Sequence, residues 1–374
     1  MRLLIAAGGT GGHIYPGISI AQVLAEQGAE VMFVGTKRGM ESDVVPRAGF
    51  PIQTISARAI PRKVSLEVPK ALLTAIKGTW EAGAVIRAFK PDVVLGTGGY
   101  VSGPALLMAA TMRYPTVIHE QNAYPGITNR ALARLVTQIA VGYPEAAAYF
   151  PKHKTAVTGN PVRPDIRNYP REEGYRVLHL DPCKRTLLLT GGSQGARSIN
   201  QALLAATSSF HQHADLQVLH AAGKAHYGSM RAELAARGIQ EDKERGELFY
   251  GNIRIVPYVY NIPAALAVAD IVVGRGGALS SAEITVRGIP AILVPYPYSA
   301  EDHQIANARV LESHGAARVI LDDQLNGETL YRNVMEILDN PTLLKRMRTA
   351  SRRLGRPQAT QELAQLVKVV AGEC

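Results

Sequence analysis

The chain opens with Leu3-Leu4-Ile5-Ala6-Ala7-Gly8-Gly9-Thr10-Gly11-Gly12-His13, an apolar run that passes directly into glycines and a histidine. The run is typical of a buried parallel strand, and the spacing of Ile18, Ala21 and Leu24 after it is typical of a helix. A glycine turn between the two leaves backbone N–H groups bare at the helix N-terminus, where anions bind. We therefore predict a phosphate loop in which His13 acts as a base or a donor, the alternative being a tight turn that His13 merely caps.

Apolar, β-branched segments alternate with helical patterns along the whole chain. They lie at 31–34, 92–95, 116–118, 138–141, 186–189, 216–219, 253–256, 270–273 and 291–294. This alternation predicts parallel sheets with right-handed crossovers. Each half opens on a strand that ends in glycines, and 91–99 resembles 269–277, so we predict an α/β protein of two doubly wound, Rossmann-like domains that face a central cleft.

The boundary between the predicted domains falls in Gly159-Asn160-Pro161-Val162-Arg163-Pro164, where two prolines flank a short extended piece. We assign 1–161 to the first domain and 164–353 to the second. A chain of 374 residues is long enough for two cores of this kind.

The composition indicates a cytoplasmic α/β protein. Hydrophobic residues make up 47% of the chain, yet no apolar run approaches the roughly 18 residues of a membrane span, and the first run breaks at Gly8, too early for a signal peptide. The two cysteines, Cys183 and Cys374, have no metal-binding spacing.

The net charge of +10 is concentrated in residues 1–163, which hold 17 Lys and Arg against 9 Asp and Glu. An anionic substrate, an anionic membrane surface or nucleic acid could each explain this asymmetry. Nucleic acid is disfavoured, because only 6% of the residues are aromatic and no nucleic-acid-binding signature occurs.

Several familiar nucleotide and metal sites have no counterpart in the sequence. The glycine loops lack both the dinucleotide fingerprint and the Walker A pattern, so we expect no NAD site and no ordinary P-loop. No Asp-x-Asp triplet occurs, and His119-Glu120-Gln121-Asn122 lacks a properly spaced third zinc ligand. We predict no metal and no cofactor.

The richest stretch after the opening one runs from 269 to 283. A strand passes through Gly274-Arg275-Gly276-Gly277 into the helix start Ala278-Leu279-Ser280, which suits a diphosphate. Glu283 could bind a sugar diol of the same ligand or merely stabilise the helix dipole.

Three other polar stretches follow predicted strands. Residues 191–196 and 301–304 could bind hydroxyl or phosphate groups, or could be an ordinary turn and a solvated loop. Residues 119–122 offer four polar side chains, of which strand alternation should allow one or two to reach a ligand.

The segment from 60 to 80 concerns partners. If Pro69 starts a helix, Leu72, Leu73, Ile76 and Trp80 form an apolar strip that Lys70 and Lys77 border. The strip would pack on the protein's own sheet, or it would dock on an anionic bilayer.

Taken together, the motifs resemble the MurG family, the bacterial glycosyltransferases that make lipid II, the peptidoglycan precursor. They occur in the family's order and spacing at 8–13, 96–104, 119–122, 159–163, 191–196, 276–279 with Glu283, and 302–304 with 307–308. The resemblance implies a GT-B fold, with a lipid acceptor at the first domain and UDP-N-acetylglucosamine (UDP-GlcNAc) in the second. It also implies that a final helix within 354–374 crosses back to the first domain.

The resemblance assigns roles residue by residue. For the donor it implies Arg163, Ser193 and the turn Ala278-Leu279-Ser280 at the diphosphate, Glu283 at the ribose, Gln304 at the sugar hydroxyls, Val259 at uracil, and further contacts from Thr10, Gly11, Gly12 and Asn122. For the acceptor it implies His13, Gly98, Gly99 and Tyr100. Two features depart from the family: Tyr260-Asn261 replaces a commonly acidic pair, and Gly276 stands where Ser or Ala is usual.

The resemblance implies a peripheral enzyme at the cytoplasmic face of the bacterial membrane, with 66–80 meeting the lipid and cell-wall synthesis proteins as possible partners. The 4-hydroxyl of the muramoyl sugar in lipid I would displace UDP from the anomeric carbon with inversion. His13 is our candidate base and Asn122 its positioner; alternatively, His13 binds the acceptor diphosphate. Two rival functions are a UDP-GlcNAc epimerase and a catalytically silent sugar-nucleotide sensor at the membrane.

Overall fold

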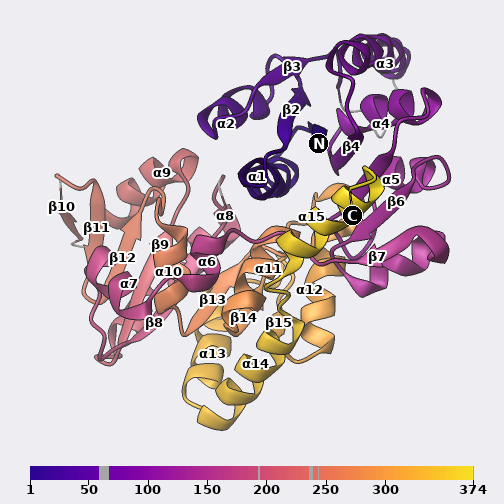
Figure 1. Cartoon of the computed structure of the whole chain (residues 1–374). Coiled ribbons are helices and arrows are strands. Elements are labelled where there is room, and N and C mark those ends of the chain that lie inside the picture. The colour runs from indigo at the N-terminus through magenta and orange to yellow at the C-terminus, as the bar shows by residue number, and fades with distance from the viewer. Residues whose placement is uncertain (59–66, 193, 236–238, 243, 374) are drawn as a thin grey trace. The chain divides into compact units, whose positions relative to one another are not determined.

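The structure is a computed structural model of the chain, and it describes residues 1–374 except 59–66, 193, 236–238, 243 and 374 (Figure 1). The described residues form two compact units. Unit 1 comprises 1–162 together with 358–374, and unit 2 comprises 163–357. The division therefore lies between Val162 and Arg163, inside the proline-flanked stretch 159–164.

Unit 1 is built on a seven-stranded parallel sheet in the order β3-β2-β1-β4-β5-β6-β7. The strands are β1 (Arg2–Ala7), β2 (Glu30–Gly35), β3 (Ile52–Thr54), β4 (Val93–Gly98), β5 (Thr116–Glu120), β6 (Gln138–Val141) and β7 (Thr155–Val157). The strand order reverses between β1 and β4. In an open α/β sheet, ligands bind outside the carboxyl ends of the strands at such a reversal.

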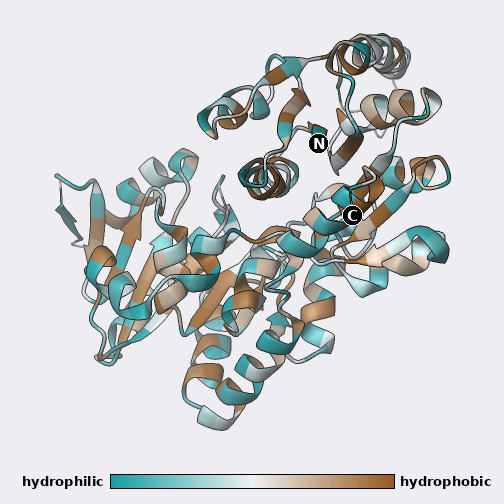
Figure 2. Cartoon of the chain, in the orientation of Figure 1, coloured by the Kyte–Doolittle hydropathy of each residue, from teal (hydrophilic) through white to brown (hydrophobic). Residues whose placement is uncertain are grey.

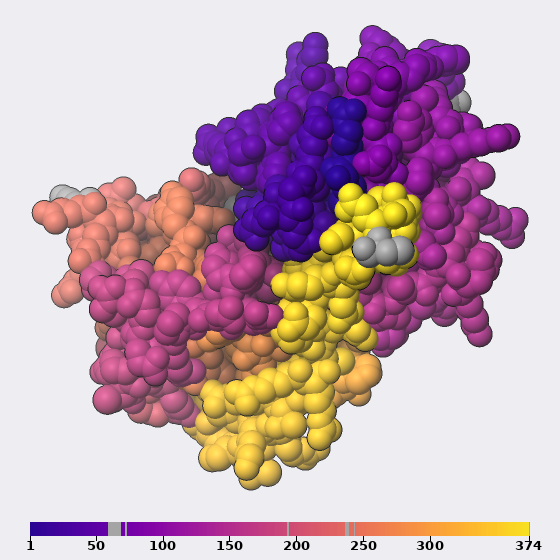
Figure 3. All heavy atoms as spheres, viewed as in Figure 1, coloured from indigo at the N-terminus to yellow at the C-terminus, as the bar shows by residue number. Residues whose placement is uncertain are grey.

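Helices cover both faces of this sheet. They are α1 (Gly11–Glu26), α2 (Glu41–Arg47), α3 (Glu67–Phe89), α4 (Ser102–Thr111), α5 (Ile127–Leu132) and α15 (Ala359–Val370), with 3₁₀ turns η1 (Pro144–Tyr149) and η2 (Lys152–Lys154). Leu4 and Val94 pack with α3 and α4 on one face, and Leu3 and Val93 pack with α1 and α15 on the other. Figure 3 shows the yellow C-terminal segment beside the indigo N-terminal residues, so the end of the chain completes the core of unit 1.

Unit 2 is built on an eight-stranded sheet in the order β10-β11-β12-β9-β8-β13-β14-β15. The strands are β8 (Arg185–Thr190), β9 (Leu216–Ala221), β10 (Gln240–Asp242), β11 (Glu247–Tyr250), β12 (Ile253–Val256), β13 (Ile271–Gly274), β14 (Ala291–Leu293) and β15 (Ala317–Val319). β11 pairs antiparallel with both of its neighbours, β10 and β12, and the remaining neighbouring strands pair parallel. The order reverses between β8 and β13, which places a second ligand edge here.

The helices of unit 2 again flank a sheet of apolar strands, which Figure 2 shows in brown in both units. They are α6 (Pro164–Asn168), α7 (Arg171–Leu178), α8 (Arg197–His211), α9 (Lys224–Ala235), α10 (Ile262–Val268), α11 (Ala278–Arg287), α12 (His303–Ser313), α13 (Gly327–Leu338) and α14 (Pro341–Leu354), with the 3₁₀ turn η3 (Ala300–Asp302). A single helix lies within 354–374, as expected, but it begins at Ala359 and not near Leu354. Helix α14 ends at Leu354, and α15 begins at Ala359 after Gly355 and Pro357, because both residues interrupt a helix.

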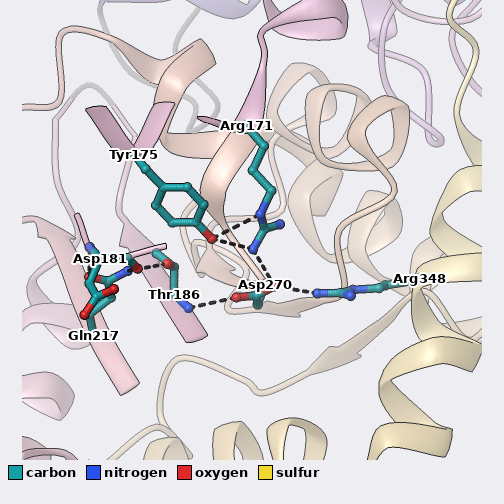
Figure 4. A network of polar contacts seen from close by, with 7 residues as sticks. All are labelled: Arg171, Tyr175, Asp181, Thr186, Gln217, Asp270 and Arg348. Carbon is teal, nitrogen blue, oxygen red and sulfur yellow. Dashed lines mark hydrogen bonds and ion pairs between the residues drawn. The ribbon is translucent and has the colours of Figure 1, made fainter. Parts of the chain in front are cut away.

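Asp270 joins four elements of unit 2 at the amino end of β13 (Figure 4). Its Oδ1 accepts hydrogen bonds from Arg171 Nη2 of α7 at 2.9 Å and from Arg348 Nη2 of α14 at 2.6 Å. Its Oδ2 accepts one from Thr186 N of β8 at 2.9 Å. The network lies at the end of β13 opposite to the glycine turn, so it braces the sheet without occupying the ligand edge.

Candidate active site

The turn between β1 and α1 has the arrangement that the sequence predicts. β1 ends at Ala7, Gly9 adopts a φ of +91°, and α1 begins at Gly11 behind an extended Thr10. The Thr10 carbonyl accepts the first helical bonds, from His13 N at 3.0 Å and from Ile14 N. Thr10 and Gly12 are exposed, so the start of α1 is open to an anionic ligand.

The glycines at the end of β4 bring the predicted acceptor residues together. A Cβ added to Gly98 would lie 2.4 Å from His13 Nδ1, so the imidazole ring packs directly on this glycine. A Cβ added to Gly99 would lie 2.0 Å from the Gly8 carbonyl oxygen, and one added to Gly9 would lie 3.1 Å from the Tyr100 ring. His13, Gly98, Gly99 and Tyr100 therefore form one cluster at the strand-order reversal of unit 1.

One of the residues 119–122 is accessible, within the one or two expected, but burial does not alternate along the stretch because β5 ends at Glu120 and both faces of the sheet are covered. His119, Glu120 and Gln121 are buried, and Asn122 alone is partly exposed. The Glu120 carboxylate accepts hydrogen bonds from Asn122 N at 2.9 Å and from Asn122 Nδ2 at 3.0 Å. It also binds Gly126 N and the Asn129 amide. Asn122 is thus the member of this stretch that is accessible from outside, and Glu120 fixes its position.

His119 plays a structural part in the same cluster. Its Nε2 lies 3.2 Å from the Gly159 carbonyl and its Nδ1 lies 3.1 Å from Gln121 Nε2. Burial lowers the pKa of His119 to about 4, and the neighbouring His13 ring also lowers it. A ring that is both enclosed and hard to protonate cannot exchange protons with a substrate, so His13 is the better candidate base of the two.

The donor-side turn of unit 2 repeats the arrangement of unit 1. β13 ends at Gly274, and α11 begins at Ala278 behind an extended Gly277, with Leu279 partly exposed and Ser280 exposed. A Cβ on Gly276 would lie 2.4 Å from the Gln304 carbonyl oxygen. This approach gives a reason for the glycine at the position where the family commonly has Ser or Ala.

Glu283 lies on α11 beside Arg163, which precedes α6. Burial raises the pKa of Glu283 to about 7, although the Arg163 charge opposes that rise. Arg163 Nη1 lies 3.6 Å from Asp165, and more than a third of the Arg163 side chain is exposed. A poised carboxylate beside an accessible guanidinium suits a ligand that carries both hydroxyl groups and a negative charge.

The remaining donor candidates occupy different settings. Gln304 is partly exposed, and its Oε1 accepts a hydrogen bond from Tyr296 N at 2.9 Å. The Val259 side chain is buried, between Tyr258 and Tyr260, whose rings make an edge contact at 5.1 Å. Ser193 lies outside the described residues.

The candidate residues therefore form two groups, one in each unit. Unit 1 holds Thr10, Gly11, Gly12, His13, Gly98, Gly99, Tyr100 and Asn122; unit 2 holds Arg163, Val259, Ala278, Leu279, Ser280, Glu283 and Gln304. Within the described ranges, we find no group of three or more His, Cys, Asp or Glu side chains that could hold a metal ion.

Helix α3 tests one of the two interpretations of the 60–80 segment, of which residues 60–66 lie outside the described part of the structure. It begins at Glu67, two residues before Pro69, and packs on unit 1 through Ala71, Ala82 and Ile86. Leu73, Ile76 and Trp80 are 68%, 50% and 67% exposed, and Lys70 and Lys77 are exposed beside them. Packing of this strip on its own sheet is therefore wrong for these three residues; the Leu72 side chain lies outside the described part of the structure.

No helix in the described part of the chain is both long enough and apolar enough to cross a bilayer.

Two carboxylates escaped the sequence reasoning. Glu41 is fully buried and accepts the Gly9 N–H, and Glu120 was counted as a ligand candidate although it holds Asn122. The available signal for Glu41 was an acid directly after Gly35-Thr36-Lys37-Arg38-Gly39-Met40, a glycine-flanked loop at a strand end.

Family models and full-length relatives both indicate a glycosyltransferase. Residues 3–141 match the glycosyltransferase family 28 N-terminal domain, and 186–367 match the family 28 C-terminal domain. The chain is 46% identical to a protein of Desulforamulus reducens and 43% identical to one of Halothermothrix orenii, in both cases over 99% of this chain and 99% of the relative. Both relatives are named UDP-N-acetylglucosamine–N-acetylmuramyl-(pentapeptide) pyrophosphoryl-undecaprenol N-acetylglucosamine transferase.

Solved structures agree. The crystal structure of Acinetobacter baumannii MurG has a TM-score of 0.76 at 28% identity and covers 98% of this chain and 99% of its own. A UDP complex of Staphylococcus aureus MnaA has a TM-score of 0.69 at 15% identity, over 100% of this chain and 98% of its own, which shows a shared fold alone.

Proposed function

The chain belongs to glycosyltransferase family 28, and from this premise we propose that it transfers N-acetylglucosamine from UDP-GlcNAc to the 4-hydroxyl of the muramoyl sugar in lipid I, giving lipid II. The single observation that carries the proposal is the shared name of relatives that are 43% and 46% identical over 99% of both chains. The glycine clusters at both strand-order reversals support it, because the reaction needs two anionic substrates to be held.

The reaction is a displacement with inversion. The acceptor oxygen forms a bond to the anomeric carbon as the bond from that carbon to UDP breaks, and a base takes the hydroxyl proton. We assign the base to His13, whose ring packs on Gly98 and whose carbonyl oxygen accepts a hydrogen bond from Thr97 Oγ1 at 2.7 Å. Asn122, held by Glu120, positions the reacting groups.

On the donor side, charge must be stabilised as UDP leaves. We assign this role to Arg163 and to the N–H groups at the start of α11, with Ser280 at the same turn. Glu283 binds the ribose hydroxyls and Gln304 the sugar hydroxyls. No step in this assignment requires a metal ion.

The membrane contact is part of the same proposal. Leu73, Ile76 and Trp80 give α3 an exposed apolar strip with Lys70 and Lys77 at its border. Such a strip fits the interface of an anionic bilayer, where apolar side chains enter and lysines meet the head groups. We infer a peripheral enzyme on the cytoplasmic face of the cell membrane, where lipid I would be reached.

The experiment that tests the function measures UDP release from UDP-GlcNAc with and without a soluble lipid I analogue. We expect release only when the acceptor is present, together with a disaccharide product. Formation of UDP-N-acetylmannosamine without acceptor would favour the epimerase instead. Binding of UDP-GlcNAc with no turnover in either condition would favour the sensor.

A further inference from the structure

Glu41, the first residue of α2, places a carboxylate in the interior of unit 1 (0% exposed). Its Oε1 accepts hydrogen bonds from Thr36 N at 2.9 Å and from Thr36 Oγ1 at 2.8 Å. Its Oε2 accepts one from Gly9 N at 3.1 Å. A carboxylate is costly to bury unless its oxygens are hydrogen-bonded, so these three donors explain why it is tolerated there.

The backbone around Glu41 leaves room for this side chain. A Cβ on Gly8 would lie 2.9 Å from Glu41 Oε1, one on Gly35 would lie 2.5 Å from Glu41 Cγ, and one on Gly39 would lie 2.2 Å from Oε1 and Oε2. Three glycines from two strand ends and the loop before α2 thus enclose one carboxylate. The close approach of these three glycines fixes the position of the Glu41 carboxylate.

The opposite side of the Gly8-Gly9 turn carries the candidate acceptor residues. A Cβ on Gly9 would lie 3.1 Å from the Tyr100 ring, and one on Gly99 would lie 2.0 Å from the Gly8 carbonyl oxygen. The turn is therefore held between the Glu41 carboxylate and the 99–100 segment. Any shift of the carboxylate must move the turn against Gly99 and Tyr100, because tightly packed atoms transmit displacement.

The hydrogen bond from Gly9 N to Glu41 also determines which N–H groups of the 8–13 loop remain for a ligand. The Gly9 N–H is committed to Oε2, and a negative charge behind Gly9 repels a second anion at that place. The donors to Glu41 are Thr36 and Gly9, so the N–H groups at the start of α1, beyond Thr10, are not committed to this carboxylate and keep the favourable helix-terminus field.

Building on the proposed function, we propose that Glu41 is a positioning residue for the lipid acceptor. It fixes the Gly8-Gly9 turn against Gly99 and Tyr100, and it directs the acceptor diphosphate away from the Gly9 N–H to the N-terminus of α1. Glu41 itself touches no substrate.

The test measures two KM values of the E41Q enzyme. The concentration of a soluble lipid I analogue is varied in one series and that of UDP-GlcNAc in the other. Glutamine keeps the size of the side chain but replaces one carboxylate oxygen by an NH₂ group. That group cannot accept the hydrogen bonds that Gly9 and Thr36 donate. We expect the KM for the acceptor analogue to rise about tenfold and the KM for UDP-GlcNAc to change by less than about twofold. If E41Q does not fold, T36V, which removes only the hydroxyl donor, should raise the acceptor KM about threefold.

Val45→Ala provides the matched control, because Val45 is a buried residue of the same helix whose side chain carries no hydrogen-bonding group. It lowers stability without removing a hydrogen bond. An unchanged acceptor KM in folded E41Q or T36V, or an equal rise in V45A, would overturn the assignment. Failure of the proposed function has a different signature, namely no acceptor-dependent UDP release by the wild-type enzyme.

Discussion

His13 is the residue on which the proposed chemistry depends most directly. Replacement by alanine removes the base while leaving Gly98, on which the ring packs, in place. We expect kcat with a lipid I analogue to fall by about 10²–10⁴, the usual contribution of a general base. His153→Ala is the control, since His153 is an exposed histidine of the same unit. Near-wild-type turnover by H13A would remove His13 from the base role.

Glu283 predicts a pH dependence with opposite signs for binding and stability. Because burial raises its pKa to about 7, the side chain is neutral at pH 6 and ionised at pH 8. The ionised form accepts hydrogen bonds from ribose hydroxyls through both oxygens, so the wild-type KM for UDP-GlcNAc should fall as the pH rises through 7. In E283Q that pH dependence should disappear, with a KM about tenfold higher at pH 8.

The stability of the free protein should respond the other way. A raised folded-state pKa gives stability that is complete below the unfolded pKa of 4.5 and lost as the pH rises through about 7. Relative to wild type, E283Q should therefore gain stability between pH 5 and pH 8, measured by urea unfolding. A constant difference across this range would show that Glu283 is not held at a raised pKa.

At the same scale, the sequence could place the candidate site residues at strand ends, but it could not identify the residues that support them. Glycines, His13 and Asn122 follow apolar runs, so position in the sequence places them at strand ends. Glu41 and Glu120 act through partners that only the folded chain brings near, Gly9 at 32 residues and Asn129 at 9 residues of separation. The glycine-flanked loop before Glu41 is a local signal, but no local pattern identifies the partner that either carboxylate binds.

Among the elements, α3 makes the most direct prediction about partners. Its exposed strip should bind vesicles that contain anionic lipid, and a double substitution of Leu73 and Trp80 by serine should weaken that binding about tenfold or more, since burying such side chains contributes about 1.5–3 kcal/mol each. Val369→Ser, at an exposed apolar residue of α15, is the control. Sedimentation with vesicles measures the effect, and equal loss in the control would argue against a contact specific to α3.

The Asp270 carboxylate joins four elements of unit 2, so its removal should lower the stability of that unit. Asp270→Ala leaves the Thr186 N–H and two guanidinium groups without this acceptor, so it should lower the free energy of unfolding by about 2–3 kcal/mol. Glu173→Ala breaks only an exposed pair with Arg176 and should lower the free energy of unfolding much less than Asp270→Ala does. Urea unfolding compares the two variants, and equal losses would mean that the network adds little.

The sequence predicts whether a segment is a helix or a strand better than it predicts where the element ends or which strands pair. The predicted runs at 186–189 and 270–273 fall on β8 and β13, because continuous apolar stretches suit a sheet buried on both faces. The antiparallel edge of β10 and β11 is not predicted by the sequence, since β10 is short and polar and β11 holds only the three apolar residues 248–250. The break between α14 and α15 depended on Gly355 and Pro357, which the expected single helix passed over.

At the scale of the whole molecule, the chain visits unit 1 twice. Periodicity alone shows that α15 has an apolar face but not which core receives it; the return was expected only from the family resemblance. Leu363 and Val367 lie fully buried in the core that Leu3, Ile5 and α1 form, and the amino group of Met1 pairs with Glu373 at 3.0 Å. The last residues of the chain therefore stabilise its first strand.

This arrangement predicts a destabilisation confined to one unit. Leu363→Ala creates a cavity in the core of unit 1 and should lower its stability by about 2–5 kcal/mol, whereas Val369→Ala on the exposed face of the same helix should change it by less than about 0.5 kcal/mol. Hydrogen exchange should show lost protection in β1 and α1 but not in β8 or β13, and UDP binding by unit 2 should persist. Equal loss of protection in both units would instead mean that the chain unfolds as a single cooperative body, so that a change in α15 also alters the donor site.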